Sequence, residues 1–86
     1  MSIVHVIGTG TIGEPLIGLL TDDREAFGID EVSFSKHTPS EIERAKVWDL
    51  QRRGAVLAVE AGRHDEFTAA GYEPALEARE AIERAT

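Results

Sequence analysis

The sequence predicts part of an α/β fold, a parallel sheet of about three strands with flanking helices. Three observations support it. A β-branched run at residues 2–7 passes directly into a glycine-rich turn and then into an apolar, helix-periodic segment. Strand-like and helix-like segments then alternate along the chain, which is typical of a parallel sheet with helices on its faces. A continuous apolar run at residues 55–59 suits a strand that is buried on both faces.

The turn after the first strand has the spacing Gly-x-Gly-x-x-Gly, formed by Gly8, Gly10 and Gly13. In a nucleotide-binding unit, these glycines allow a sharp turn, close approach of a pyrophosphate and close helix-to-strand packing. The helix begins at Thr11 and Ile12, where unpaired N–H groups and a partial positive charge favour phosphates. The turn therefore predicts a Rossmann-like dinucleotide-binding unit. The alternative is a glycine turn that serves packing alone.

The second strand is expected at residues 30–35, with Val32 and Phe34 on one face. The preceding residues 22–28 are expected to form a polar connection. This completes a strand-helix-strand unit of the usual length, so the first two strands should pair in parallel.

A helix is predicted over residues 39–53 from its start signal. Thr38 would be the N-cap, Pro39 the first helical residue and Glu41 the capping-box carboxylate. Gly54 would end the helix in a left-handed conformation. Its apolar residues spread around much of the helix, which predicts contact with two surfaces or with a partner domain.

The last third of the chain predicts a short helix over residues 64–70 stopped by Gly71, an extended segment over 72–76 and a final helix over 77–85. The alternation would place another strand after that helix, and none is present. We therefore expect residues 1–86 to be the N-terminal part of a dinucleotide-binding domain, with the catalytic domain absent from this chain.

Composition excludes several kinds of function. The net charge of −7 disfavours nucleic acid and anionic membranes as partners. The chain has no cysteine, so it contains no disulfide, thiolate metal site or cysteine nucleophile. His5, His37 and His64 lack the spacing of a metal site, and no metal is expected. No apolar run reaches the roughly 18 residues of a membrane span, so we expect a cytoplasmic protein.

The end of the second strand bears on the choice of cofactor. An Asp or Glu about 20 residues past the glycine turn would bind the ribose 2′-hydroxyl of NAD. Ser35, Lys36 and Thr38 occupy this region instead. A cation with hydroxyl neighbours suits a 2′-phosphate, so NADP is favoured over NAD, and use of both stays open. The alternative is that Lys36 is a solvated loop residue.

No catalytic group can be assembled from these residues, neither a Ser-His-Asp set, a carboxylate pair nor a metal triad. His5 is expected to be a hydrogen-bonded residue of the sheet, and Trp48 a core or interface residue. Phe67 and Tyr72 are expected to pack around Gly71.

The segment Gly8-Thr9-Gly10-Thr11-Ile12-Gly13 resembles the cofactor loop of glyceraldehyde-3-phosphate dehydrogenases, in particular the archaeal (type II) branch. Residues 35–39 stand where that branch has a Thr/Lys-rich segment before proline, and residues 43–59 and 66–85 resemble its following elements in pattern. The resemblance implies a phosphorylating, NAD(P)-dependent aldehyde dehydrogenase of glycolysis. It also implies a Rossmann domain, a separate catalytic domain and a tetramer.

Carried over by position, the cofactor contacts of that family fall on Thr11 and Ile12 at the pyrophosphate and on Ser35, Lys36 and Thr38 near the 2′-phosphate. The chain departs from the family at Glu14 and Pro15, which replace a basic pair, so the phosphate contacts there stay open. The family's catalytic cysteine would lie beyond the last residue. The implied partners are the cofactor, the remainder of the parent enzyme and further copies of the protein.

Two other functions stay open. One is the cofactor domain of another Rossmann reductase, such as a semialdehyde or homoserine dehydrogenase relative. The other is a non-catalytic module that senses a nucleotide. A strand and then a cysteine after residue 86 in the parent gene would favour a dehydrogenase, whereas a stop codon would favour the module.

Overall fold

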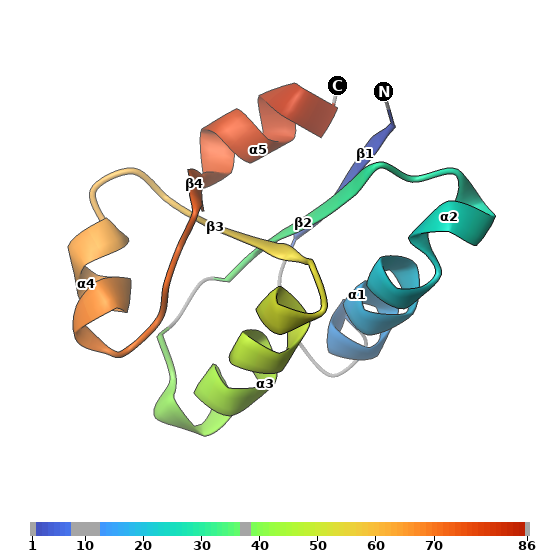
Figure 1. The fold of residues 1–86 in the computed structure, drawn as a ribbon. Coiled ribbons are helices and arrows are strands. Elements are labelled where there is room, and N and C mark those ends of the chain that lie inside the picture. The colour runs from blue at the N-terminus through green and yellow to red at the C-terminus, as the bar shows by residue number, and fades with distance from the viewer. Residues whose placement is uncertain (1, 8–12, 37–38, 86) are drawn as a thin grey trace.

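The computed structural model of the chain describes residues 2–7, 13–36 and 39–85. They form a four-stranded sheet with all neighbouring strands parallel (Figure 1). In sheet order the strands are β1 (Ile3–Ile7), β2 (Glu31–Ser35), β3 (Val56–Val59) and β4 (Leu76–Glu77). The helices are α1 (Gly13–Asp22), α2 (Arg24–Phe27), α3 (Glu41–Arg52), α4 (His64–Ala69) and α5 (Ala78–Ala85). The predicted parallel α/β arrangement is confirmed.

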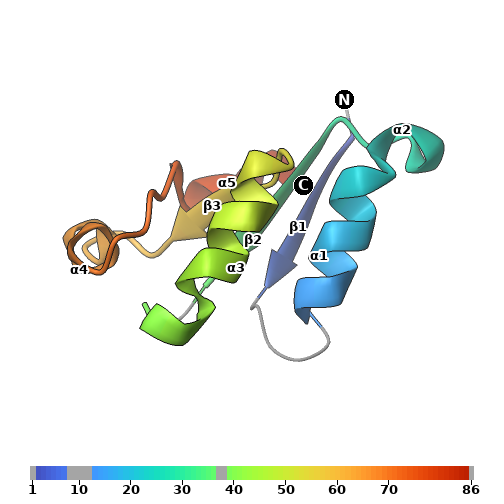
Figure 2. The ribbon, with the colours of Figure 1, turned by 60° about the horizontal axis from the view of Figure 1, so that its bottom comes forward.

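Helices cover both faces of the sheet. Helices α1 and α3 lie side by side on one face, and α5 crosses the other face from β4 toward β1 (Figures 1 and 2). Ile7 pairs with Ser35, so the chain leaves β1 and β2 at the same edge, the carboxyl edge of the sheet. Helices α1 and α3 both begin near this edge (Figure 2). None of the helices in the described ranges combines the length and apolarity needed to cross a membrane.

The connection before β2 differs from the prediction. Instead of a polar connection, the chain continues α1 to Asp22 and then forms the short helix α2. Arg24, Glu25 and Ala26 are good helix formers, which explains why a second helical turn follows. Gly28, with φ of 69°, ends it in the left-handed conformation.

Helix α3 begins later than predicted. Its N-cap is Ser40 and its first residue is Glu41, so the predicted roles of Thr38 as N-cap and Pro39 as first helical residue are wrong. Ser40 is extended, with ψ of 132°, and the hydroxyl of Tyr72 donates a hydrogen bond to its carbonyl oxygen. The Thr-Pro start signal is local, whereas this contact joins residues 32 positions apart.

The sheet has one strand more than expected. The extended segment predicted over residues 72–76 ends in β4, whose Leu76 pairs with Ala58 of β3. The preceding Ala75 N–H donates to the carbonyl oxygen of Leu57 at 2.9 Å. A two-residue strand has too few side chains to show an alternating pattern, and such short strands are typical of sheet edges.

One continuous core lies between the sheet and helices α1 and α3. Alternate residues of the strands point into it, as the pairs Val4–Val32 and Val6–Phe34 require. The fully buried core side chains are Ile17, Val32, Phe34, Leu57, Val59 and Phe67. The predicted shared face of Val32 and Phe34 and the burial of β3 are confirmed.

Helix α3 touches two surfaces, which is one of the two alternatives that its spread of apolar residues predicted. Val47 and Leu50 are buried against the sheet. On another side, Arg44, Trp48 and Gln51 donate hydrogen bonds to the carbonyl oxygens of Ala70, Gly71 and Glu73 at 3.0, 3.0 and 2.8 Å. These donors stand about one helical turn apart and hold the segment that leads into β4.

Gly54 is expected to tolerate substitution less well than Gly28. Its φ of 115° lies outside the left-handed helical region that other residues can adopt at a small cost, whereas Gly28 has a φ of 69°, inside that region. We expect Gly54→Ala to lower the free energy of unfolding by about 2 kcal/mol or more, and the matched Gly28→Ala by about 1 kcal/mol. Urea unfolding measures the free energy of unfolding of both variants, and an equal decrease in the two would contradict this prediction.

Candidate functional site

The glycine motif joins a strand to a helix. Strand β1 ends at Ile7, at the carboxyl edge of the sheet, and α1 begins at Gly13, so the motif stands between these two elements in the sequence. The predicted site residues Gly8, Gly10, Thr11, Ile12 and Thr38 lie outside the described residues. Gly13 is the first residue of α1. The surrounding elements thus have the order that the motif needs.

Ser35 and Lys36 lie at the same edge of the sheet, as predicted. Ser35 is the last residue of β2, and Lys36 follows it. The Lys36 side chain is only 4% exposed and forms an ion pair with Glu43 in the first turn of α3, whose side chain is 39% exposed. The predicted position of Lys36 after β2 is confirmed, the alternative of a solvated loop residue is wrong, and the ion-pair partner was not predicted. The one available signal was a pair of glutamates at the start of the following helix.

The acidic residues next to β2 lie at the opposite edge, as predicted. The carboxylate of Asp30 accepts a hydrogen bond from the backbone N–H of Ser2 at 2.6 Å. Glu31 forms an ion pair with Arg84 of α5 at 2.8 Å. Both carboxylates therefore serve the fold at the amino edge of the sheet, and neither lies at the carboxyl edge, where β1 and β2 end.

His5 lies on the sheet face that α5 covers, and it is a sheet residue as predicted. Its Nδ1 lies 2.8 Å from the hydroxyl oxygen of Ser33 on β2. Its Nε2 is buried and has no hydrogen-bond partner among the described residues. Burial lowers the pKa of the imidazole, because the charged form loses contact with water. The site therefore favours the neutral ring.

We expect His5 to make stability depend on pH. Because its pKa is lower in the folded than in the unfolded state, the unfolded chain binds more protons below about pH 6.5. Stability should be fully present above that pH and fall as the pH drops toward the folded pKa, by no more than about 1.4 kcal/mol per pH unit. Melting temperatures from pH 7.5 to 5.5 should fall more steeply for the parent than for His5→Gln. Parallel curves would exclude His5 as the cause.

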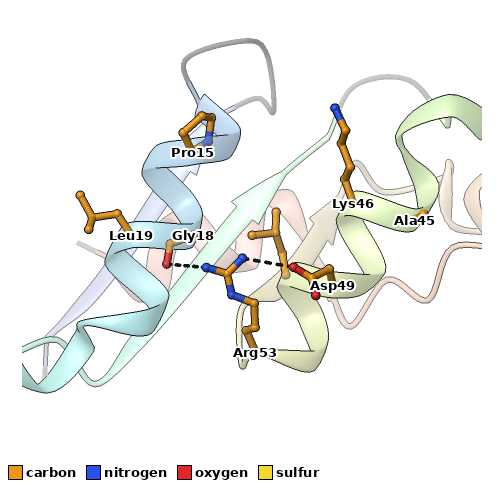
Figure 3. A pocket seen from close by; sticks show the side chains of 8 residues that line it. Pro15, Gly18, Leu19, Ala45, Lys46, Asp49 and Arg53 are labelled. Carbon is orange, nitrogen blue, oxygen red and sulfur yellow. Dashed lines mark hydrogen bonds and ion pairs between the residues drawn. The ribbon is translucent and has the colours of Figure 1, made fainter.

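A groove separates α1 from α3 on the outer side of the sheet (Figure 3). It encloses about 380 Å³. Pro15 and Leu19 line it from α1, and Lys46 and Asp49 line it from α3, with Arg53 between the helices (Figure 3). The groove combines apolar walls with charged groups, so its ability to take a ligand depends on what those charges already bind.

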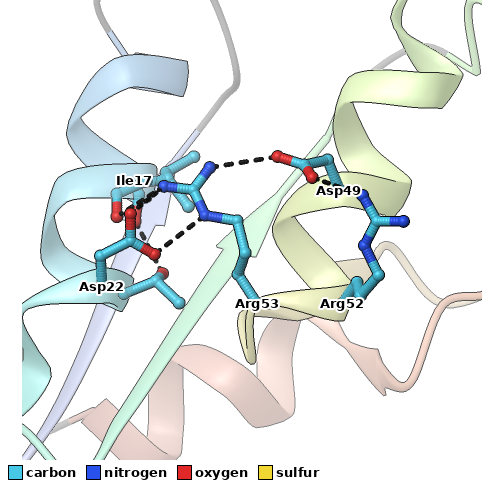
Figure 4. Close-up of polar contacts among 7 residues, drawn as sticks. Ile17, Asp22, Asp49, Arg52 and Arg53 are labelled. Atoms are coloured by element: carbon cyan, nitrogen blue, oxygen red, sulfur yellow. Dashed lines mark hydrogen bonds and ion pairs between the residues drawn. The ribbon is translucent and has the colours of Figure 1, made fainter.

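Arg53 is fully engaged in joining the two helices (Figure 4). Its guanidinium donates to both carboxylate oxygens of Asp22, to Asp49 at 3.2 Å and to the carbonyl oxygen of Gly18 at 3.2 Å. These bonds raise the pKa of Arg53, with the hydrogen bond to Asp22 as the largest cause. They also lower the pKa of Asp22. The pKa of Asp49 is lowered as well, mainly by its hydrogen bond from Arg52 and to a smaller extent by that from Arg53. The charges in the groove therefore hold α1 against α3.

Aromatic side chains have structural roles. Phe67 and Tyr72 are buried and pack edge to face with ring centroids 5.4 Å apart, as predicted for the surroundings of Gly71. Trp48 is 46% exposed, and the guanidinium of Arg44 lies 5.1 Å from its ring centroid. In the part of the chain that the structure describes, no three His, Asp or Glu side chains are grouped closely enough to hold a metal ion.

Among the described residues, Ser35 and the Lys36–Glu43 pair therefore lie at the carboxyl edge of β1 and β2, near the starts of α1 and α3. Comparisons of the chain with protein-family models, with curated proteins and with solved structures gave no match.

Proposed function

We propose that this chain binds a dinucleotide cofactor, NAD or NADP, at the carboxyl edge of the sheet. One observation carries the proposal: the Gly-x-Gly-x-x-Gly motif stands between the end of β1 and the start of α1, with β2 parallel to β1. The motif alone is weak evidence. A strand before it, a helix after it and a parallel neighbouring strand are the context that distinguishes a nucleotide-binding unit from a chance glycine pattern.

The residues of this chain would bind and orient the cofactor. Helix α1 directs its N-terminus, with unpaired N–H groups and a partial positive charge, toward the edge where the pyrophosphate would lie. On this proposal, Ser35 and Lys36 at the end of β2 would contact the adenosine ribose, as residues at the end of this strand do in such folds. The bound cofactor would supply the hydride acceptor.

The parent protein, on this proposal, is an NAD(P)-dependent oxidoreductase of the cytoplasm that resembles glyceraldehyde-3-phosphate dehydrogenase. The support is the resemblance of residues 8–13 and 35–39 to that family together with the parallel sheet. The 86 residues contain no cysteine, so the nucleophile of such an enzyme would come from another part of the protein. Further copies of the chain and the remainder of the enzyme would be its partners.

Calorimetric titration of the 86-residue chain with NAD and with NADP tests the proposal. The adenosine half of the cofactor contacts the glycine turn and the end of β2 in this fold, so adenosine 5′-monophosphate and adenosine 2′,5′-bisphosphate are included as smaller probes. Saturable binding of at least one probe is expected. Failure of all four to bind to the folded chain would refute cofactor binding.

Lys36→Ala is expected to weaken NADP binding more than NAD binding, by about 1 to 3 kcal/mol. The substitution removes the cation next to the ribose position and leaves Glu43 without its ion-pair partner. The unpaired carboxylate would repel a 2′-phosphate but not a 2′-hydroxyl. Titration of the variant with both cofactors measures the difference, and equal losses would remove Lys36 from the ribose subsite.

A further inference from the structure

We infer that Glu43 selects the cofactor and makes the site prefer NAD, which carries a 2′-hydroxyl, over NADP, which carries a 2′-phosphate. The inference rests on the proposed function, because it assigns a role within the same site. It reverses the preference that Lys36 alone predicts. The contact that carries it is the ion pair between Lys36 and Glu43.

The two partners differ in how far they reach solvent. The Lys36 side chain is 4% exposed, whereas the Glu43 side chain is 39% exposed. A ligand that approaches the end of β2 from solvent therefore meets the carboxylate more readily than the ammonium group. The pair as a whole has no net charge, so it offers a 2′-phosphate no excess positive charge.

The chemistry of the ribose then favours the hydroxyl form. A 2′-hydroxyl can donate a hydrogen bond to a carboxylate, which is the contact that an acidic residue provides in this class of fold. A 2′-phosphate accepts hydrogen bonds and carries negative charge, so a neighbouring carboxylate repels it. Here the carboxylate comes from the first turn of α3 instead of from the end of β2, which carries Ser35 and Lys36.

Glu43 is held in place by the anchoring of α3. The hydroxyl of Tyr72 bonds the carbonyl oxygen of Ser40 at the N-cap, and Arg44 bonds the carbonyl oxygen of Ala70 at 3.0 Å. The partial positive charge at the start of α3 also stabilises a carboxylate in its first turn. The backbone that carries Glu43 is therefore fixed within reach of Lys36, and the ion pair with Lys36 holds the carboxylate at the end of β2.

The test compares Glu43→Gln with Glu41→Gln in the 86-residue chain, titrated with NAD and NADP. Both variants remove one negative charge from the first turn of α3 and keep the side-chain length. Glu41 is exposed and serves as the matched control for the change in net charge. We expect the parent to bind NAD more tightly. Glu43→Gln should shift the ratio of affinities toward NADP by about tenfold or more, and Glu41→Gln by about threefold or less.

The outcomes separate this inference from the proposed function. If the parent binds NAD or NADP but Glu43→Gln changes the ratio no more than Glu41→Gln does, Glu43 does not select the cofactor and the proposed function stands. A parent that already prefers NADP also overturns the inference. If the folded parent binds none of the probes, the proposed function itself fails. Far-ultraviolet circular dichroism and melting temperature establish that each variant is folded.

Discussion

Gly10→Val is expected to abolish binding of NAD and NADP, with a loss of affinity of about a hundredfold or more. In this motif the second glycine lets the backbone approach the pyrophosphate, and a branched side chain would occupy that space. The substitution lies between β1 and α1 in the chain and replaces neither of their core residues, Val6 and Ile17. The helical circular-dichroism signal should therefore remain close to that of the parent.

Thr9→Val is the matched control for that experiment, because it places the same side chain at a variable position of the same motif. It should change affinity by about threefold or less. Calorimetric titration with both cofactors measures the two variants side by side. If Gly10→Val retained the parental affinity, the glycine turn would serve only the close packing of strand and helix.

Tyr72→Ala is expected to lower the free energy of unfolding by about 3 to 5 kcal/mol. Tyr72 is 1% exposed, packs edge to face on Phe67 and bonds the N-cap of α3 through its hydroxyl. Truncation would leave a cavity and an unpaired carbonyl at Ser40. A domain of this size is stable by roughly 4 to 13 kcal/mol, so the loss is a large part of the total.

Tyr72→Phe separates the ring from its hydroxyl. It keeps the edge-to-face contact and removes only the hydrogen bond to Ser40, so we expect a loss of about 1 kcal/mol. Urea unfolding measures this variant even if Tyr72→Ala does not fold. A similar loss for both variants would mean that the hydroxyl contact, and not the burial of the ring, dominates at this position.

The elements with a clear pattern were predictable from the sequence. The strands at residues 3–7, 31–35 and 56–59 and the helix at 64–69 lie within a residue or two of their predicted bounds, because hydrophobic periodicity and glycine stops are local properties. The start of α3 was not predictable in the same way. The hydroxyl of Tyr72 bonds Ser40, and this contact spans 32 positions of the chain.

The positions of the described candidate residues along the sheet were predictable. The length of the first unit predicted that Ser35 and Lys36 lie at the end of β2, and the structure has Ser35 level with the end of β1, whereas binding at this edge stays a prediction. The pairing of Lys36 with Glu43, which neutralises the charge at the end of β2, was not predictable. Spacing along a strand says which residue comes next, but it does not say which side chain of another helix lies against it.

The sequence by itself determined the parallel α/β architecture, the order of strand, glycine motif and helix along the chain, and the absence of a cysteine nucleophile from these residues. Only the tertiary structure decided that Lys36 is buried and paired with Glu43, and that Arg53 joins α1 to α3. The physical reason is that backbone patterns depend on neighbours within a few residues. Ion pairs and burial depend on which helices pack together, and in this chain α3 packs where it brings a carboxylate to the end of β2.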